Sequence, residues 1–234
     1  MATRTIREAA DAIREVKRLT GRMVAINLEP AAISEDIEKD PVWSLTEGRR
    51  ATVGNAKKAA DMGVDMIILT GNPGIGVSNH AIVHALNELK AAVGDRVILT
   101  AGKMHAAGVI SEGGENILTE NDVDAFIDAG ADILLLPAPG TVPGITMEYA
   151  HKLIARAHAK GALAMTTIGT SQEGADEATI REIALMCKMA GADIHHIGDS
   201  GYMGMAIPDN ITAYSIAIRG KRHTYRRMAM SLLR

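Results

Sequence analysis

The sequence predicts an α/β protein of the TIM-barrel type, in which helices alternate with the strands of a parallel sheet. Six times along the 234 residues, a helical stretch ends in glycine and passes within a few residues into an apolar strand. The strands are runs of Val, Ile and Leu with little polar alternation, as expected when both faces of a parallel sheet are covered. Strict alternation of helix and strand also favours a parallel sheet.

The six helix-to-strand junctions form a repeat along the chain. Their glycines are Gly21, Gly63, Gly94, Gly130, Gly161 and Gly191, which stand 42, 31, 36, 31 and 30 residues apart. A glycine just past a helix end adopts the left-handed conformation that closes the last turn. A spacing near 30 residues is about what one strand, one crossover helix and two short loops require.

The expected helices carry recognisable start signals. Ser78 precedes a helix over 79–94, Thr119 and Asp122 form a capping-box pattern before 123–130, Thr146 precedes a helix over 147–161, and Pro208 opens the last helix. We expect one domain over 1–234, with an N-terminal helix over 1–20 and a basic C-terminal helix over 209–234.

Two parallel architectures compete for this pattern. A doubly wound sheet would usually show a GxGxxG turn after its first strand, but LEPAAISED follows that strand here. A barrel places its site on the loops after the strands, and those loops hold most of the polar Gly/Pro-rich sequence. We therefore prefer the barrel. Only six units are recognisable, which indicates an incomplete (β/α)8 barrel or an open one whose edges another subunit covers, so we expect a homo-oligomer.

Composition and charge narrow the class of protein. Apolar residues make up 47% of the chain, the single cysteine excludes an internal disulfide, and no apolar run approaches the roughly 20 residues that span a bilayer. The N-terminus lacks the apolar stretch of a signal peptide, so we expect a cytoplasmic protein without a membrane partner.

The C-terminal segment is strongly basic, since residues 219–234 hold six Lys or Arg and no acid. Such a tail binds nucleic acid, an anionic surface, the protein's own acidic surface or another subunit, and the scarcity of stacking aromatics disfavours nucleic acid.

The third strand ends in the most informative motif, AGKMHAAG. Lys103 and His105 share one parity, so both side chains are expected to project together into a site. A lysine that leaves an apolar strand can be desolvated and act as a Schiff-base nucleophile, or stay charged to clamp a phosphate or stabilise an enolate. Glu29, at the end of the first strand, is a candidate general base, although a hydrogen bond that fixes the loop is the alternative.

Small and polar residues at three strand ends suggest an anion site. The loops after the last two strands of a (β/α)8 barrel often hold a phosphate through backbone N–H groups. The candidate binding residues are Asn72, Gly169, Thr170, Ser171, Gly198, Ser200 and Gly201, with Asp199 as a further catalytic candidate. Ordinary turn structure is the alternative for each of these loops.

A divalent metal is an alternative cofactor. Glu29, His105 and Asp199 could converge through the fold on Mg²⁺ or Zn²⁺. His195 and His196 cannot easily bind one ion together, because adjacent strand residues face opposite ways.

The motifs NLEP, LTGNPG, AGKMHAAGV, LLLPAPGTVPGIT, IGTSQEGADEATI, ADIHHIGDSGY and IAIRGKRHTYRRMA give the chain a resemblance over nearly its whole length from about Arg22. It resembles an uncharacterised bacterial TIM-barrel family whose members are often labelled haloacid dehalogenase-like hydrolases and sometimes occur beside sugar phosphotransferase systems. The resemblance implies two further N-terminal strand–helix units in those relatives. The hydrolase label implies a DxDx[TV] nucleophile loop, which this sequence lacks, as it lacks the EDKxxPK-type loop of phosphonomutase-like lyases.

These observations lead to three functional hypotheses. The first is a lyase or isomerase for a small phosphorylated or carboxylated metabolite, in which Lys103 stabilises an enolate or forms an imine while Glu29 and His105 move protons. The second is a metal-assisted phosphoester hydrolase that uses Glu29, His105 and Asp199. The third is a metabolite-binding protein without catalytic activity.

Overall fold

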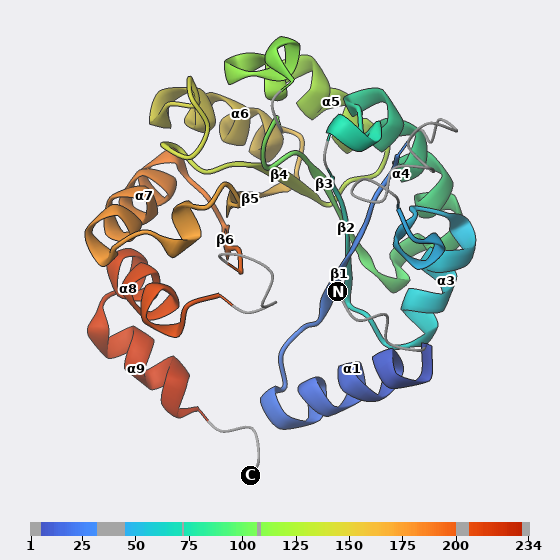
Figure 1. The fold of residues 1–234 in the computed structure, drawn as a ribbon, viewed down its shortest axis with the longest axis horizontal. Coiled ribbons are helices and arrows are strands. Elements are labelled where there is room, and N and C mark those ends of the chain that lie inside the picture. The colour runs from blue at the N-terminus through green and yellow to red at the C-terminus, as the bar shows by residue number, and fades with distance from the viewer. Residues whose placement is uncertain (1–5, 32–44, 72, 107–108, 200–205, 231–234) are drawn as a thin grey trace. The chain divides into compact units, whose positions relative to one another are not determined.

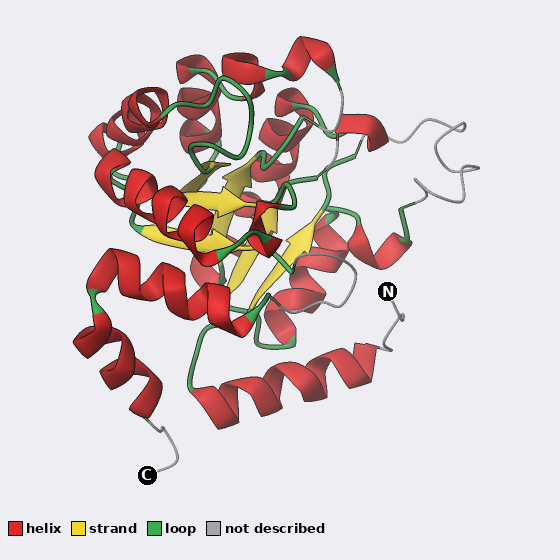
Figure 2. Ribbon diagram, turned by 60° about the vertical axis from the view of Figure 1, so that its left-hand side comes forward, coloured by secondary structure: helices red, strands yellow, loops and turns green. Residues whose placement is uncertain are grey.

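The fold is an α/β arrangement of six parallel strands, described here for residues 6–31, 45–71, 73–106, 109–199 and 206–230 of a computed structural model (Figures 1 and 2). The strands are β1 (Ala25–Leu28), β2 (Met66–Leu69), β3 (Ile98–Gly102), β4 (Ile133–Pro137), β5 (Leu163–Ile168) and β6 (Ile194–Ile197). They form one six-stranded sheet in sequence order, β1-β2-β3-β4-β5-β6. The prediction of a TIM-barrel-like fold with six recognisable units is confirmed.

Helices alternate with the strands from β1 to β6, with α1 before the first strand and two helices, α8 and α9, after the last. They are α1 (Ile6–Thr20), α3 (Val53–Asp61), α4 (Asn79–Val93), α5 (Glu120–Asp128), α6 (Met147–Ala159), α7 (Glu177–Ala190), α8 (Pro208–Arg219) and α9 (Lys221–Ala229). Among the described helices, none is both long enough and apolar enough to cross a membrane.

The local signals in the sequence act as expected. All six junction glycines have positive φ, between 57° and 105°. Ser78 and Thr146 cap α4 and α6 through their side chains, and Thr119 and Asp122 exchange hydrogen bonds at the start of α5. The basic segment predicted as one helix over 209–234 instead contains two helices, because Gly220 adopts φ 79°, ψ 160° between α8 and α9.

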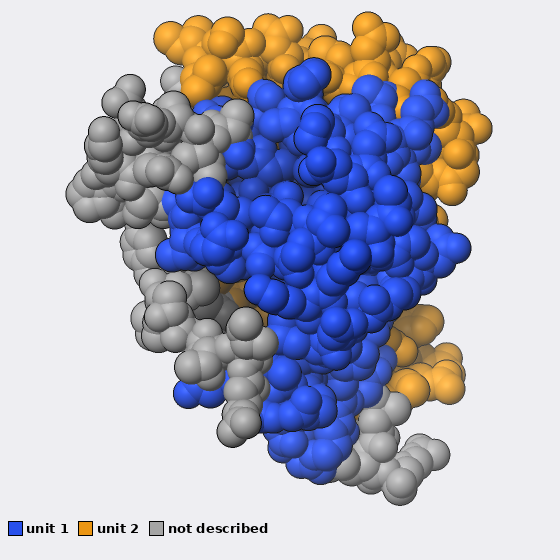
Figure 3. Space-filling model, turned by 90° about the vertical axis from the view of Figure 1, so that its right-hand side faces the viewer, with its two compact units in different colours: residues 1–102, 125–133, 232–234 blue, residues 103–124, 134–231 orange. Residues whose placement is uncertain are grey.

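The chain divides into two compact units, shown in Figure 3. Unit 1 comprises residues 1–102, 125–133 and 232–234, and unit 2 comprises residues 103–124 and 134–231. Unit 1 holds β1, β2 and β3, which pair in parallel with Ile67 between Ile26 and Leu99. In that unit α3 and α4 pack against each other outside the strands (Figure 1).

Unit 2 is built from β5, β6 and most of β4, with α6, α7 and α8 packed in succession (Figure 1). Its apolar cluster includes Ile168, Ile180, Cys187 and Tyr214. Cys187 is fully buried, as expected of a core residue. The β5–β6 register sets Thr166 opposite His195 and Thr167 opposite His196, so the two histidines face opposite sides of the sheet.

An aspartate just before every second strand is hydrogen-bonded to the backbone of the neighbouring strand. Asp65, Asp132 and Asp193 stand just before β2, β4 and β6, and each accepts a 2.8 Å hydrogen bond from the backbone N–H of Val24, Leu99 and Ala164, respectively. Each also pairs with a base on a preceding helix, namely Lys17, Lys90 and His158. The Gly-x-Asp pattern of these junctions therefore joins each helix, through one carboxylate, to the start of the neighbouring strand.

Candidate functional site

The carboxyl end of β3 carries a buried ion pair in unit 2. Lys103 is 1% exposed, and its amine lies 2.5 Å from the carboxylate of Glu112. Glu112 closes a short 3-10 helix, Ile110–Glu112, that follows the strand. Lysine is rarely buried so completely unless its charge is paired. Lys103 is thus buried at the end of an apolar strand, and its carboxylate partner is a residue that the sequence did not single out.

His105 follows two residues later and is half-buried. Burial lowers the pKa of its imidazole below the ordinary value of 6.5. An imidazole in this environment is neutral near pH 7 and can accept a proton.

A buried acid lies beside the loops predicted to bind an anion. Glu173 belongs to the 3-10 helix Gln172–Gly174 after β5 and is 7% exposed. A Cβ added at Gly198 would lie 3.3 Å from Glu173 Oε1. Among the described atoms, Glu173 Oε2 has no hydrogen-bond partner. A carboxylate at this position opposes the binding of a phosphate next to Gly198, because like charges repel strongly where water is excluded.

His196 completes this part of the site. Its Nδ1 is buried without a hydrogen-bond partner in the described part of the chain. Burial lowers the pKa of His196, while the charges of Glu173 and Asp199 oppose that shift. Glu173 and His196 therefore lie close enough for the charge of Glu173 to act on the imidazole. The alternation of side chains in the HHI sequence, which turns His196 away from His195, is the signal that could have singled out His196.

His195 has a different role from its neighbour. Its Nδ1 lies 3.0 Å from Tyr214 Oη, and the two rings are 5.3 Å apart. Burial lowers the pKa of His195, and the charge of Arg219 lowers it further. His195 packs against α8, whereas His196 faces the other side of the sheet. These opposite directions agree with the prediction that the two histidines cannot easily bind one ion.

The loop after β5 is held by contacts of its own. Ser171 adopts φ 77°, a left-handed conformation that non-glycine residues rarely take. Thr170 Oγ1 lies 3.0 Å from the carbonyl of Thr141, which follows β4, and also contacts Gln172. A Cβ added at Gly169 would lie 3.0 Å from Met104 Sδ, so the loop after β5 packs directly against the residue next to Lys103.

Asn210 anchors the same loop to α8. It is 4% exposed, and its amide donates to the carbonyls of Glu173 and Ala175 at 2.8 and 2.9 Å.

Several of the predicted site residues lie at one end of the strands of unit 2, where a barrel carries its site. They are Lys103, Gly169, Thr170 and Gly198. Asn72, Ser200 and Gly201 lie outside the described residues.

Glu29 belongs to unit 1 and has its own partner. It is 7% exposed, and its carboxylate pairs with Arg49. Burial raises its pKa, while Arg49 opposes that shift. Its backbone is also bonded on both sides, from its N–H to Arg49 O at 2.8 Å and from Ala51 N–H to its own carbonyl at 3.0 Å. Gly71 packs against it, since an added Cβ would meet Glu29 Cγ at 3.3 Å.

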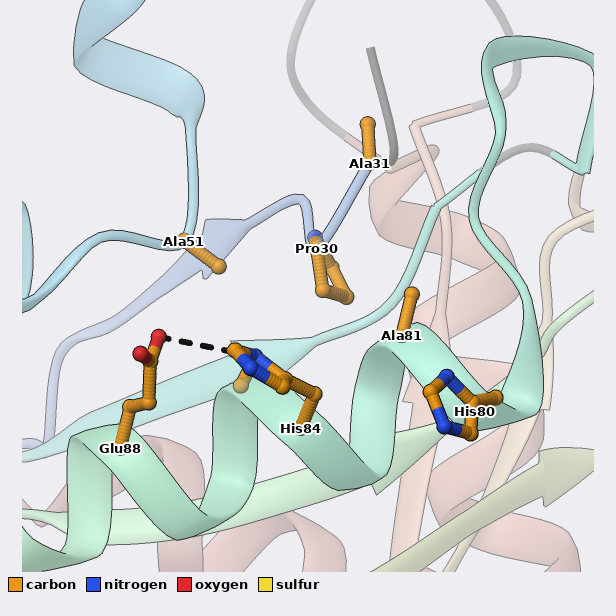
Figure 4. Close-up of a pocket in the computed structure, with 8 residues that line it drawn as sticks. Pro30, Ala31, Ala51, His80, Ala81, His84 and Glu88 are labelled. Atoms are coloured by element: carbon orange, nitrogen blue, oxygen red, sulfur yellow. Dashed lines mark ion pairs between the residues drawn. The ribbon is translucent and has the colours of Figure 1, made fainter.

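Unit 1 contains a cavity of about 310 Å³ whose lining includes Pro30, the residue after Glu29 in the chain (Figure 4). Pro30, Ala51, Ala81 and Ala85 form much of its apolar lining. Figure 4 shows His80, His84 and Glu88 in succession along α4, where His84 Nδ1 lies 3.6 Å from Glu88. Within the described residues, no group of three His, Cys, Asp or Glu side chains is placed to hold a metal ion.

The chain belongs to a family whose model matches residues 2–234 and is described as "Domain of unknown function (DUF7916)". No curated protein sequence matches the chain.

Solved structures show the fold alone, because sequence identity to them is low. The deoxyribose phosphate aldolase of Aeropyrum pernix matches at a TM-score of 0.56 and 14% identity, over 90% of this chain and 80% of that one. A provisionally assigned lyase/mutase of Burkholderia cenocepacia J2315 matches at 0.55 and 15%, over 90% and 71%. A provisionally assigned phosphonomutase of the same organism matches at 0.54 and 17%, over 89% and 80%.

Proposed function

We propose that this member of the DUF7916 family is a lyase or isomerase that forms an enolate from a small phosphorylated or carboxylated carbonyl compound. The proposal rests on the buried Lys103–Glu112 pair at the carboxyl end of β3. A fixed cation in a site from which water is excluded stabilises a developing oxyanion far more than it would in water. Enolate formation creates such an oxyanion next to the carbon that loses its proton.

Lys103 acts in this proposal as a charge and not as an amine nucleophile. A lysine attacks a carbonyl only as a free amine, whereas the amine of Lys103 is paired with a carboxylate at 2.5 Å. The anionic oxygen of the substrate would replace the carboxylate of Glu112, whose side chain is 27% exposed and can move into water. Imine formation is the alternative use of the same amine.

Histidine moves the proton. His105 and His196 both have lowered pKa values, because both are buried, and each can accept a proton as a neutral imidazole. The neighbouring Glu173 stabilises the imidazolium that would form at His196. Glu29, which belongs to unit 1 and pairs with Arg49, is not needed for this chemistry.

The comparisons support the choice of reaction class only through the shared fold. An aldolase of a deoxysugar phosphate and provisionally assigned lyases and mutases have this fold. Phosphorylated sugars and 2-keto acids are therefore the first substrates to test.

Exchange of hydrogen for deuterium at the carbon next to the carbonyl tests the proposal. This exchange requires only the compound that forms the enolate, so any co-substrate of the reaction need not be known. The protein is incubated in heavy water with a panel of phosphorylated aldoses and ketoses and of 2-keto acids, and deuterium next to the carbonyl is measured by mass spectrometry. We expect exchange with at least one compound, and a loss of roughly 100-fold or more in Lys103→Met. Lys152→Met is the matched control, because Lys152 pairs with Glu120 in the same unit but is 57% exposed.

Two outcomes would overturn the proposal. One is an absence of exchange across the whole panel, and the other is exchange that Lys103→Met leaves unchanged. Borohydride treatment during the reaction separates the two uses of the amine, since only an imine leaves a stable adduct on Lys103.

A further inference from the structure

A cavity of about 390 Å³ at the α8–α9 turn is lined by Arg219, Arg222, His223 and Arg226. All four side chains are exposed, and no acidic residue of the described part of the chain lines the cavity. Among the described residues, none of the four forms an ion pair. The cavity lies wholly in unit 2 and shares no lining residue with the strand ends that carry Lys103 and His196.

The turn that shapes this cavity is well supported. Gly220 separates the two helices with φ 79°. Thr224, which is 2% exposed, lies with its Oγ1 3.0 Å from Ser215 Oγ and so ties the first turns of α9 to α8. Lys188 donates to the carbonyl of Ile218 at 2.8 Å, which fixes the end of α8 to α7. The guanidinium groups therefore project from a scaffold with defined contacts.

Part of this charge placement opposes the stability of α9, although the helix dipole favours Arg226 in the last turn. Arg222 and Arg226 are four residues apart on one helix, a spacing at which like charges repel. The first turn of α9 contains no acidic residue, although the helix dipole favours negative charge there. Arg219 also disfavours the charged form of His195, whose pKa it helps to lower. A bound anion would relieve each of these repulsions.

We propose that this arginine-lined cavity binds a small ligand with two or more linked phosphoryl groups. Arginine presents a planar fork of N–H donors that matches phosphate oxygens in pairs, and three such forks exceed what a single monoanion needs. The cavity has room for a ligand of that size. A binding site here is separate from the proposed catalytic residues and does not depend on that proposal.

Calorimetric titration of the full chain with inorganic tripolyphosphate tests this inference. We expect saturable binding, weaker binding to orthophosphate, and a decrease in affinity as the salt rises from about 50 to about 300 mM. The double variant Arg222→Ala, Arg226→Ala should bind at least about tenfold more weakly, because charge-assisted hydrogen bonds are lost. Arg222→Lys, Arg226→Lys keeps the charge but not the forks and should fall between the two.

The matched control removes two positive charges elsewhere in unit 2. Arg181 pairs with Glu177 and Lys152 with Glu120, so Arg181→Ala, Lys152→Ala should bind tripolyphosphate like the wild type. Circular dichroism of each variant reports whether the helices are retained. A parallel titration with a nucleoside triphosphate shows whether a base adds to the affinity of the phosphate chain.

Three results would overturn the inference. The first is equal loss of binding in the control and the arginine variants, which would indicate a general charge effect. The second is a wild type that binds no tripolyphosphate and forms a dimer that the arginine variants abolish, which would assign the cavity to a subunit interface. The third is tight binding of an RNA oligonucleotide that tripolyphosphate cannot displace.

Discussion

The amine of Lys103 lies 2.5 Å from the carboxylate of Glu112, yet Lys103 is 1% exposed and the side chain of Glu112 is 27% exposed. The two members of the pair therefore depend on each other to different degrees. Glu112 can reach water if its partner is removed, whereas a charged Lys103 without Glu112 is shielded from water and has no other counter-ion among the described residues.

Glu112→Gln should therefore destabilise the fold more than Lys103→Met. Removal of one partner from a buried pair costs about 3–5 kcal/mol when the other charge stays buried, and Glu112→Gln has that effect on Lys103. Lys103→Met leaves only a carboxylate that can hydrate. The double variant should recover much of the loss. Urea denaturation of the four proteins measures the free energies of unfolding, and equal losses in the two single variants would contradict the asymmetry.

Asn210→Ala should loosen the loop that carries Glu173. The amide of Asn210 donates to the carbonyls of Glu173 and Ala175, and its loss leaves two acceptors without their donor in a buried environment. We expect a loss of roughly 2–6 kcal/mol in the free energy of unfolding, at about 1–3 kcal/mol for each unsatisfied group. Asn87→Ala, on the exposed face of α4, is the control and should change stability little. A loss in Asn210→Ala no larger than in the control would show that water replaces the amide.

The aspartates before β2 and β6 should make the fold sensitive to acid. Burial raises the pKa of Asp193, but hydrogen bonds from His158 and the Ala164 N–H outweigh it and leave the pKa below the ordinary value of 3.8. Burial also raises the pKa of Asp65, but hydrogen bonds from Lys17 and from the Val24 N–H outweigh this effect and leave the pKa below 3.8.

A folded-state pKa below the unfolded one means that these carboxylates stabilise the fold above about pH 3.8 and lose that contribution as the pH falls through the folded value. The Asp193→Asn variant should therefore have a lower free energy of unfolding than the wild type at neutral pH. Its free energy of unfolding should also fall less than that of the wild type as the pH is lowered from neutral to acid. Glu182→Gln, an exposed change on α7, serves as the reference. Parallel loss curves for Asp193→Asn and the wild type would contradict the assignment.

Much of the fold follows from local chemistry that one sequence displays. The junction glycines need positive φ, and the caps at Ser78, Thr119 and Thr146 act within three residues of themselves. The burial of Lys103 was likewise predictable, because it directly continues an apolar strand. Each of these features depends on residues close together in the chain.

The partners of the site residues were not predictable from the same sequence. Glu112 reaches Lys103 across nine residues, and Asn210 reaches Glu173 across thirty-seven. The small residues of the loop after β5 predict an anion site, whereas the structure buries the carboxylate of Glu173 in that loop. Nothing in the spacing shows that the carboxylate of Glu173 is buried beside Gly198, since that contact depends on how the loops after β5 and β6 pack.

Gly198→Ala tests this packing directly. A Cβ at position 198 would lie 3.1 Å from the carbonyl oxygen of Ile168 and 3.3 Å from Glu173 Oε1. The first contact is with backbone that is itself bonded to the Gly198 N–H at 2.9 Å, so the strand end cannot move away without loss of that bond. We expect a loss of about 1–3 kcal/mol in the free energy of unfolding, typical of overpacking.

Gly48→Ala is the control. A Cβ at position 48 meets no atom within 4 Å, so this variant should be neutral or slightly stabilising. If His196 accepts the proton as proposed, Gly198→Ala should also reduce deuterium exchange more than Gly48→Ala does, because it displaces the carboxylate whose charge acts on His196. Equal stability and equal exchange in the two variants would show that the loops after β5 and β6 are not packed against each other.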